Sequence, residues 1–262
     1  MDHAFVIPVY GRPPYLQSCV RSIMNQTTGA PRVLIGTSTP SDYIADIGAA
    51  FGIPVLVNPE RANIAADWNF AMESSDSRFV TIAHQDDEYA PQYLETMGRL
   101  AADHPDMVLA FSDYREHTDQ GERPMNLNLR VKRWLCARAF QGREAIRART
   151  AKRRLLSLGN PVCCPSVMLD REHVPDFRFS TSLKTNLDWD AWLRLSQVDG
   201  EFVYARRSLI SKRVHPGSET TVTIANRIRQ TEDLQMFRHF WPKPVATLIA
   251  AVYSIGYFSN RV

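Results

Sequence analysis

The sequence predicts an α/β fold with a mostly parallel central sheet flanked by helices. Through the first half of the chain, short apolar segments typical of strands alternate with segments of helical periodicity. Strands that alternate with helices pair in parallel, because each helix carries the chain back to the same edge of the sheet. The length of 262 residues, with 44% hydrophobic and 23% charged side chains, suffices for one large globular core.

The elements of the first half follow one another in a regular order. Strand-like segments lie at residues 4–9, 32–36, 54–57, 78–83 and 107–111, and helix-like segments lie at residues 14–25, 41–51, 64–73 and 92–102. In the first helix-like segment, Leu16, Val20 and Ile23 recur at the spacing of one helical face. The first half therefore has the pattern of a repeated strand–helix unit.

The second half is less regular. A polar stretch at residues 113–130 is followed by a basic segment, an apolar run at 162–169, a helix expected near 190–197, short strands at 201–205 and 209–214, and a helix at 224–240. No internal repeat or low-complexity linker separates the two halves. We therefore expect an irregular second half that is built onto the same core.

Charge is distributed unevenly along the chain. Residues 130–154 contain ten Lys or Arg and one acid, Glu144, so the rest of the chain is net acidic although the whole carries +3. A basic segment of this density favours phosphate-bearing partners, unless it is a solvated helix face. Only Trp134 and Phe140 provide aromatic rings within it, so no nucleic-acid partner is expected.

The cysteines and the first residues indicate a cytoplasmic protein. Cys19, Cys136, Cys163 and Cys164 show no metal-ligand spacing, and an adjacent pair is a poor disulfide framework, so reduced thiols are expected. The strand-like segment 5–9 starts without a basic leader, so no signal peptide is expected.

The apolar segment 244–258 is too short for a membrane span, which needs roughly 20 residues. Trp241 and Lys243 precede it and Arg261 follows it. This pattern is typical of an interfacial helix on a membrane surface or of an oligomer contact such as a homodimer. A helix docked on the core is the alternative.

Two adjacent carboxylates, Asp86 and Asp87, follow the fourth predicted strand. In parallel sheets, ligands bind at the carboxyl edge of the strands. Adjacent acids at a buried strand end repel each other and are costly to desolvate unless a cation lies beside them. A divalent metal with oxygen ligands, often carrying a diphosphate, is the usual cation. An acidic pair that faces water is the alternative.

Four segments, taken in order, resemble the family 2 glycosyltransferases, which are inverting enzymes with the GT-A fold. They are residues 5–12 (Phe-Val-Ile-Pro-Val-Tyr-Gly-Arg), residues 63–69 with the Asp86–Asp87 pair, residues 187–195 and residues 212–218. The resemblance implies a GT-A domain over residues 1–220, with a nucleotide-sugar-binding half at 1–112 and an acceptor-side half at 113–220. Residues 221–262 are then a C-terminal helical segment, membrane-interfacial or oligomerising.

The resemblance implies a donor site at the end of the first strand. In the family this turn cradles the base and ribose of the nucleotide, which gives that role to Pro8, Val9, Tyr10 and Arg12. The Tyr10 ring is also suited to stack on a base.

Three further residues are assigned to the nucleotide sugar. Asn63 and Asp67 stand where the family places residues that contact the sugar or base, although Asn63 also suits a helix N-cap. The family commonly has an acid after the second strand that reads uracil, whereas this chain has hydroxyls, Thr37 and Ser38. Thr37 is therefore a candidate substitute, and the donor nucleotide is left open.

The resemblance makes Asp86 the metal ligand, supported by Asp87 and His215, with Mg²⁺ or Mn²⁺ as the cofactor. His84 stands where relatives often have a first aspartate, which leaves strict metal dependence open. Asp86 would also contact the nucleotide sugar through its diphosphate.

The family's general base comes from a Glu-Asp element at the head of a late helix. Here Leu187 replaces the Glu, and Asp188 is the implied base. A helix N-terminus should keep this carboxylate ionised. Trp189 and Asp190 are expected to line the acceptor site.

Taken together, the resemblance implies transfer of one hexosyl or deoxyhexosyl unit, with inversion, from a nucleotide-diphosphate sugar to a hydroxyl acceptor. The basic segment and apolar tail point to a lipid-linked saccharide in surface polysaccharide synthesis, at the inner face of the membrane. The alternative is a degenerate, non-catalytic GT-A domain that binds a nucleotide sugar or supports a partner transferase.

Overall fold

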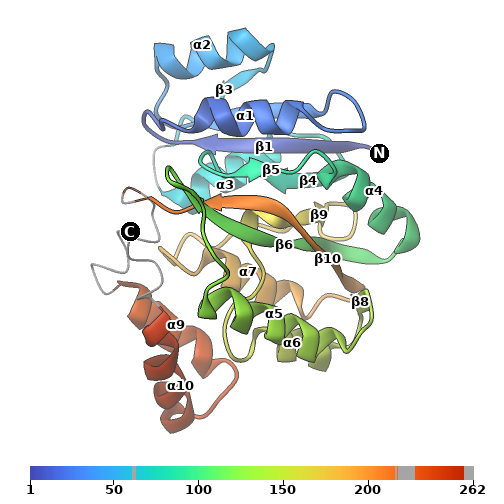
Figure 1. Cartoon of the computed structure of the whole chain (residues 1–262), viewed down its shortest axis with the longest axis vertical. Helices are drawn as coiled ribbons and strands as arrows, with labels where there is room; N and C mark the ends of the chain where they lie inside the picture. Colours follow the sequence, from blue (N-terminus) through green and yellow to red (C-terminus); the bar gives the residue numbers. More distant parts are fainter. Residues whose placement is uncertain (61–62, 216, 218–227, 257–262) are drawn as a thin grey trace.

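The computed structural model describes residues 1–60, 63–215, 217 and 228–256, and a ten-stranded mixed sheet runs through them (Figure 1). The strands are β1 (His3–Val9), β2 (Arg32–Thr37), β3 (Val55–Val57), β4 (Phe79–Ile82), β5 (Glu88–Tyr89), β6 (Met107–Thr118), β7 (Gly121–Glu122), β8 (Ala145–Ile146), β9 (Met168–Asp170) and β10 (Glu201–Arg213). Their order in the sheet is β3-β2-β1-β4-β9-β6-β10-β5, with β7 beside β6 and β8 beside β10.

Helices cover both faces of this sheet. They are α1 (Leu16–Met24), α2 (Asp42–Phe51), α3 (Ile64–Glu73), α4 (Tyr93–Asp103), α5 (Leu127–Phe140), α6 (Arg149–Leu156), α7 (Leu187–Leu195), α9 (Ile228–Arg238) and α10 (Lys243–Ile255), with a short 3₁₀ turn at Cys164–Ser166. Figure 1 shows α2 at one end of the molecule and the pair α9–α10 at the other.

The fold class and the first-half elements are confirmed. β1 pairs in parallel with β2 and β4, and β2 pairs in parallel with β3, as the alternation predicts. Side chains of β1 alternate between two cores: Phe5 and Ile7 pack with α1, α2 and α4, whereas Val6 packs in the cluster that contains α3, α6 and α7. This double burial explains why the strand is a continuous apolar run.

The second half differs from expectation in its strands. The two short strands expected at 201–205 and 209–214 form one strand, β10, which runs parallel to β6. The register shifts between Ala205 and Ser208, where the exposed pair Arg206–Arg207 interrupts the apolar pattern. β6 extends to Thr118, seven residues beyond the expected end. β9, from the apolar run, is antiparallel to both β4 and β6.

Some expectations lie outside the described residues. These concern Pro216 and Ser218 in the late family segment, the start of the helix expected at 224–240, and the end of the apolar tail with Arg261. Among the described residues, no helix is both long enough and apolar enough to cross a membrane.

The basic segment forms α5, β8 and α6, and most of its charges have local partners. Arg147 pairs with Asp106 at 2.7 Å, and Arg149 pairs with Asp199 at 3.3 Å. Lys152 is fully buried and donates hydrogen bonds to the carbonyls that follow α7, including Val198 O at 2.6 Å. Part of the segment therefore serves the fold rather than a ligand.

The start of β10 depends on a glycine. Gly200 has φ +117°, and a Cβ there would lie 2.6 Å from Asp106 O and 2.7 Å from Val108 Cγ2. Gly121 has a similar φ of +115°, but a Cβ there would meet no atom within 4 Å. The two glycines therefore have similar backbone conformations, but only Gly200 has neighbouring atoms where a Cβ would lie.

We predict that Gly200→Ala destabilises the protein more than Gly121→Ala does, by about 1–3 kcal/mol, because it adds overpacking to the same backbone strain. Denaturant unfolding of the two variants measures the difference. Equal losses of stability would show that β6 and β10 separate easily at this point.

Candidate active site

The pairing of β5 with β10 brings the acidic pair next to the end of β10. β5 follows Asp87 directly, and its residues Glu88 and Tyr89 pair with Ser211 and Ile210. Asp87 is only 1% exposed, and its Oδ1 accepts a hydrogen bond of 2.9 Å from the backbone N–H of Arg213. This contact joins segments 126 residues apart in sequence.

Asp86 and His215 meet at the same edge. The Asp86 Oδ2 and His215 Nε2 atoms are 3.1 Å apart. Burial raises the pKa of Asp86, but the hydrogen bond from His215 and the nearby His84 and His215 charges outweigh it, so the net pKa is below its usual range. Asp86 is therefore held as a carboxylate.

His84, Asp86 and Asp87 have the donor atoms of a metal site. One side-chain donor atom from each lies within 4.8 Å of the others. Within the described residues, the buried atoms Asp87 Oδ2 and His84 Nε2 have no hydrogen-bond partner. Burial and the charge of Asp86 raise the pKa of Asp87 well above its usual range, and the charges of Lys212 and Arg213 offset only part of this rise.

The donor set fits Mg²⁺ or Mn²⁺, with Mn²⁺ better suited to the imidazole. Burial lowers the pKa of His84 to about 4, so its ring is neutral, which is the form that binds metals. Sequence comparison treated His84 only as a departure from the family pattern. The geometry makes it a third candidate ligand beside Asp86 and Asp87, whereas His215 contacts Asp86.

Asp188 lies on the first turn of α7, and its Oδ2 accepts a hydrogen bond of 2.9 Å from Asn160 Nδ2. Burial raises the pKa of Asp188 above its usual range, and the charges of Arg229, Lys132 and Lys212 offset only part of this rise. Desolvation thus opposes the helix N-terminus, which was expected to favour the ionised form of this carboxyl group.

The first strand ends beside His84, Asp86 and Asp87, which are called the metal-type group below. The Tyr10 N–H donates to Gln85 Oε1 at 3.0 Å, so the turn after β1 touches the segment that carries Asp86. Pro8 and Val9 belong to β1, and the Val9 side chain is buried in the core. Arg12 lies farther out, over the Tyr43 ring.

The sequence model described as "Glycosyl transferase family 2" matches residues 4–175. The chain belongs to this family. The family predicted from the sequence is thus confirmed.

Two curated relatives are similar to this transferase. "Putative glycosyltransferase EpsH" of Bacillus subtilis (strain 168) is 26% identical over 110 residues, which cover 40% of this chain and only 32% of EpsH. "Uncharacterized protein MT1568" of Mycobacterium tuberculosis (strain CDC 1551 / Oshkosh) is 25% identical over 228 residues, or 84% of this chain and 70% of that protein.

Two solved structures share the fold of the transferase. The mannosyltransferase PcManGT from Pyrobaculum calidifontis, in complex with GDP-Man and Mn²⁺, has a TM-score of 0.65 at 14% identity, covering 100% of this chain and 76% of its own. S. aureus TarS 1–349, in complex with UDP-GlcNAc, has a TM-score of 0.63 at 12% identity, covering 99% of this chain and 73% of its own. These likenesses agree with the GT-A fold.

The charges of three cations lower the pKa of the Asp188 carboxyl group. Lys132 points inward from α5 and donates to Tyr114 Oη at 2.9 Å. Lys212 lies on β10, and its charge lowers the pKa of both Asp87 and Asp188. Arg229 lies at the start of α9 and acts on Asp188 as well. The sequence did not reveal this cluster, because Lys132 lies among surface bases of the same type.

The two residues expected to line the acceptor site have other roles. Trp189 is 0% exposed, donates from Nε1 to Leu156 O at 3.2 Å, and packs edge-on against Phe237. The Trp189 ring is therefore enclosed by the core, and its contact with an acceptor stays a prediction. Asp190 is engaged by Arg194 in a 2.8 Å ion pair one turn along α7.

The other predicted donor-site residues, Asp67, Thr37 and Asn63, form hydrogen bonds that fix the local backbone and the ends of β2, β3 and α3. Both carboxylate oxygens of Asp67 accept hydrogen bonds of 2.9 Å, from Ser38 Oγ and Asn58 Nδ2, which tie α3 to the ends of β2 and β3. The buried Thr37 hydroxyl accepts from the N–H of Thr39 at 3.0 Å. Asn63 caps α3, as its alternative role predicted.

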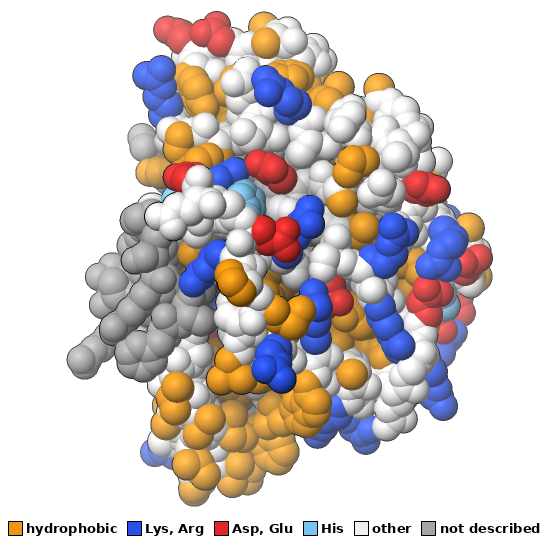
Figure 2. Space-filling model, viewed as in Figure 1, with side chains coloured by type: hydrophobic (Ala, Val, Ile, Leu, Met, Phe, Trp, Pro, Cys, Tyr) orange, Lys and Arg blue, Asp and Glu red, His pale blue; other side chains and the backbone are white. Residues whose placement is uncertain are grey.

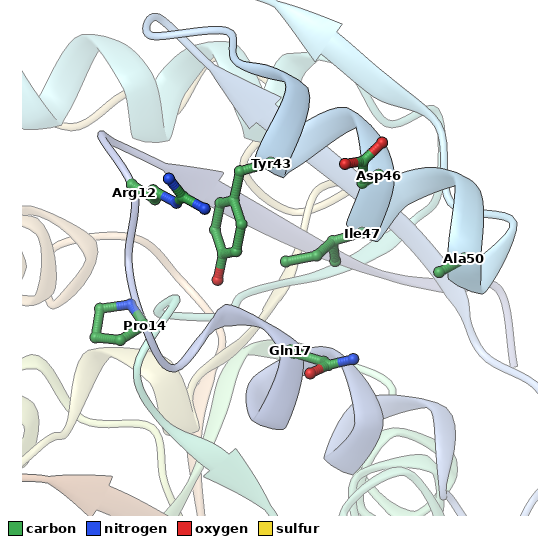
Figure 3. Close-up of a pocket in the computed structure, with 7 residues that line it drawn as sticks. All are labelled: Arg12, Pro14, Gln17, Tyr43, Asp46, Ile47 and Ala50. Carbon is green, nitrogen blue, oxygen red and sulfur yellow. The ribbon is translucent and has the colours of Figure 1, made fainter.

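A hollow of about 540 Å³ lies between the β1–α1 turn, α1 and α2 (Figure 3). Arg12 and Tyr43 point into it side by side, while Gln17 and Asp46 come from the facing helices. The acids of the metal-type group do not line this hollow. The hollow is therefore separate from His84, Asp86 and Asp87, and Arg12 is the predicted donor-site residue that lines it.

We predict that Asp86→Asn, Asp87→Asn and His84→Ala each weaken Mn²⁺ binding at least about tenfold, since outer-shell partners of metal sites already contribute that much. Asp103→Asn, an exposed acid on α4, is the matched control and should bind as wild type. Isothermal titration with and without a nucleoside diphosphate measures the affinities. Unchanged affinity in all three variants would remove the metal from this group.

Proposed function

We propose that the chain is an inverting, metal-assisted glycosyltransferase. It moves a hexosyl or deoxyhexosyl unit from a nucleotide-diphosphate sugar to a hydroxyl acceptor. Residues 1–112 would bind the donor, and residues 113–220 would bind the acceptor. The observation that carries the proposal is geometric: side-chain donor atoms of His84, Asp86 and Asp87 lie within 4.8 Å of one another, and Asp87 is hydrogen-bonded to the end of β10.

Asp188 is the general base of the proposed reaction. Its carboxylate takes the proton of the acceptor hydroxyl while the acceptor oxygen forms its bond to the anomeric carbon. The bond from that carbon to the diphosphate oxygen breaks on the opposite face, its electron pair leaves with the nucleoside diphosphate, and the configuration inverts. The hydrogen bond from Asn160 supports this role by fixing the carboxylate, and a raised pKa strengthens it as a base.

His84, Asp86 and Asp87 would hold the divalent ion, which when bound supplies positive charge for the departing diphosphate. His215 orients Asp86 through the 3.1 Å hydrogen bond. Lys132 and Lys212 provide further positive charge in the same interior. These residues together favour an anionic leaving group over a neutral one.

The nucleotide and the acceptor are less constrained. Structural neighbours were solved with UDP, with UDP-GlcNAc and with GDP-Man, so they support a nucleotide-sugar donor without selecting a base. We infer a lipid-linked saccharide acceptor in surface polysaccharide synthesis, used at the cytoplasmic face of the membrane. The apolar C-terminal helix and the basic α5 support this inference.

Nucleotide binding tests the donor site. We expect one of UDP, GDP, TDP and CDP to raise the melting temperature with Mn²⁺ and not without it, and Asp86→Ala to lose the effect while Asp103→Ala keeps it. Thermal-shift measurements report this. Metal-independent stabilisation would remove Asp86 from its role. No stabilisation by any nucleotide would favour a non-catalytic domain.

Replacing the candidate base should separate chemistry from binding. Asp188→Asn is expected to lower kcat by about 10²–10⁴-fold, because general-base catalysis contributes that much. Nucleotide affinity should stay at the wild-type value. Asp199→Asn, an exposed acid beyond α7, is the control. A kcat within a few-fold of wild type in Asp188→Asn would contradict the assignment.

The pH profile tests the same residue. The base is active only when ionised, so kcat/KM should fall as pH drops through the raised pKa of Asp188 and stay constant above it. The charges of Arg229 from α9, Lys132 from α5 and Lys212 from β10 lower this pKa and offset only part of the rise caused by burial. The acid limb should therefore lie above the ordinary aspartate range and disappear in Asp188→Asn.

A further inference from the structure

The outer face of α5 combines exposed apolar and basic side chains. Leu127, Val131 and Trp134 are between 42% and 73% exposed and recur at i, i+4 and i+7. Helical periodicity places Arg130 and Arg138 on the same face, and Arg138 Cζ is 5.8 Å from the Trp134 ring centroid. The opposite side of α5 is buried in the core. The apolar stripe of Leu127, Val131 and Trp134 is therefore not covered by any other described part of the chain.

Helix α10 carries a second apolar stripe. Val245, Leu248, Val252 and Ile255 are between 41% and 67% exposed and recur at helical spacing. The helix is docked through its other side, where the Tyr253 ring lies 5.9 Å from that of Trp189 and 5.4 Å from that of Phe237. The core-docking alternative is thus correct for one side of this helix only.

The two stripes lie in the same part of the molecule. α6 packs against α5, and Arg153 of α6 donates to His239 O at 2.7 Å in the turn before α10. Trp241 Nε1 also donates to Ser157 O at 2.7 Å, which fixes that turn. Figure 2 shows hydrophobic side chains gathered where Figure 1 places α5, α9 and α10, with Lys and Arg side chains beside them.

The charge of this region has one sign. Residues 123–143 contain six Lys or Arg and no acid, and residues 234–256 contain two Lys or Arg and no acid. Lys132 points inward and Arg133 lies 3.7 Å from Asp113, so the other bases carry the charge of the outer face. A surface of this kind complements anionic headgroups, while its apolar side chains suit the boundary of the acyl chains. Pairing with a second copy through this face would place the same positive charges opposite one another, which disfavours a dimer.

We propose that the outer faces of α5 and α10 together dock onto the surface of an anionic lipid bilayer. On the inner side of α10, the Tyr253 ring lies 5.9 Å from that of Trp189, the neighbour of Asp188 in sequence. On the inner side of α5, Lys132 donates to Tyr114 Oη, and its charge lowers the pKa of Asp188. Docking would therefore bring the acceptor side of the site next to the membrane. This inference adds a surface to the proposed function, and its test measures binding without transfer, so that each can fail alone.

The test is sedimentation of the full chain with phosphatidylcholine vesicles that contain 0% or roughly 30% phosphatidylserine, a mixture chosen to give an anionic surface. Wild type should bind the anionic vesicles, release at high salt, and ignore neutral ones. Leu248→Ser/Val252→Ser should weaken binding at least about tenfold through lost apolar burial. Arg130→Glu/Arg138→Glu should weaken it by at least about fivefold for each charge.

Matched controls lie at the other end of the sheet. Val57→Ser removes an exposed apolar side chain on β3, and Arg21→Glu/Arg32→Glu makes the same change of charge near α1 and β2. Both should bind as wild type, and melting curves confirm that all variants fold. The Trp134 emission should shift to the blue with anionic vesicles, and Trp134→Phe should remove that shift.

Three results would overturn the inference. The first is wild-type protein that ignores anionic vesicles. The second is equal binding by the stripe variants and their controls. The third is a dimer in solution that Leu248→Ser/Val252→Ser converts to a monomer, which would assign this face to a second copy of the chain.

Discussion

The burial of the Asp87 carboxylate is the constraint on which the site depends. A nearly inaccessible acid needs compensation, and the backbone N–H of Arg213 supplies part of it. The Arg213 guanidinium then binds Glu88 at 2.9 Å and Asp119 at 3.0 Å and lies over the Tyr15 ring. One residue at the end of β10 thus joins the acidic segment, the β6–β7 turn and the start of α1.

The regular half of the fold could be predicted because its signals are local. Strands such as β1 are apolar over their whole length, and helices such as α1 repeat apolar residues at helical spacing. The arrangement of the candidate site could not be predicted from such local signals. It depends on β5, a strand of two residues, whose pairing with β10 has no local signature. Family resemblance identified Asp86 and His215, and only the fold brought them together.

The differences between the sequence expectations and the structure share a physical cause. Periodicity separates buried from exposed faces but does not say what covers them. α7 is buried around most of its circumference, so Trp189 became core where an acceptor contact was expected. In the basic segment, Lys132 and Lys152 point inward, while Arg130 points to water. The charges of one basic segment are therefore divided between the interior and the surface, and composition alone gives only their total.

Helix α10 also restricts which residue can occupy position 159, next to Asn160. Gly159 has φ +138°, and a Cβ there would lie 2.7 Å from the Tyr253 ring. The carboxylate of Asp188 receives its hydrogen bond from the neighbouring Asn160. Positions 159 and 253 thus form a matched pair, in which a side chain at one requires a smaller ring or a different helix angle at the other. Any chain that kept this reaction while exchanging its last helix would have to rebuild the two positions at the same time.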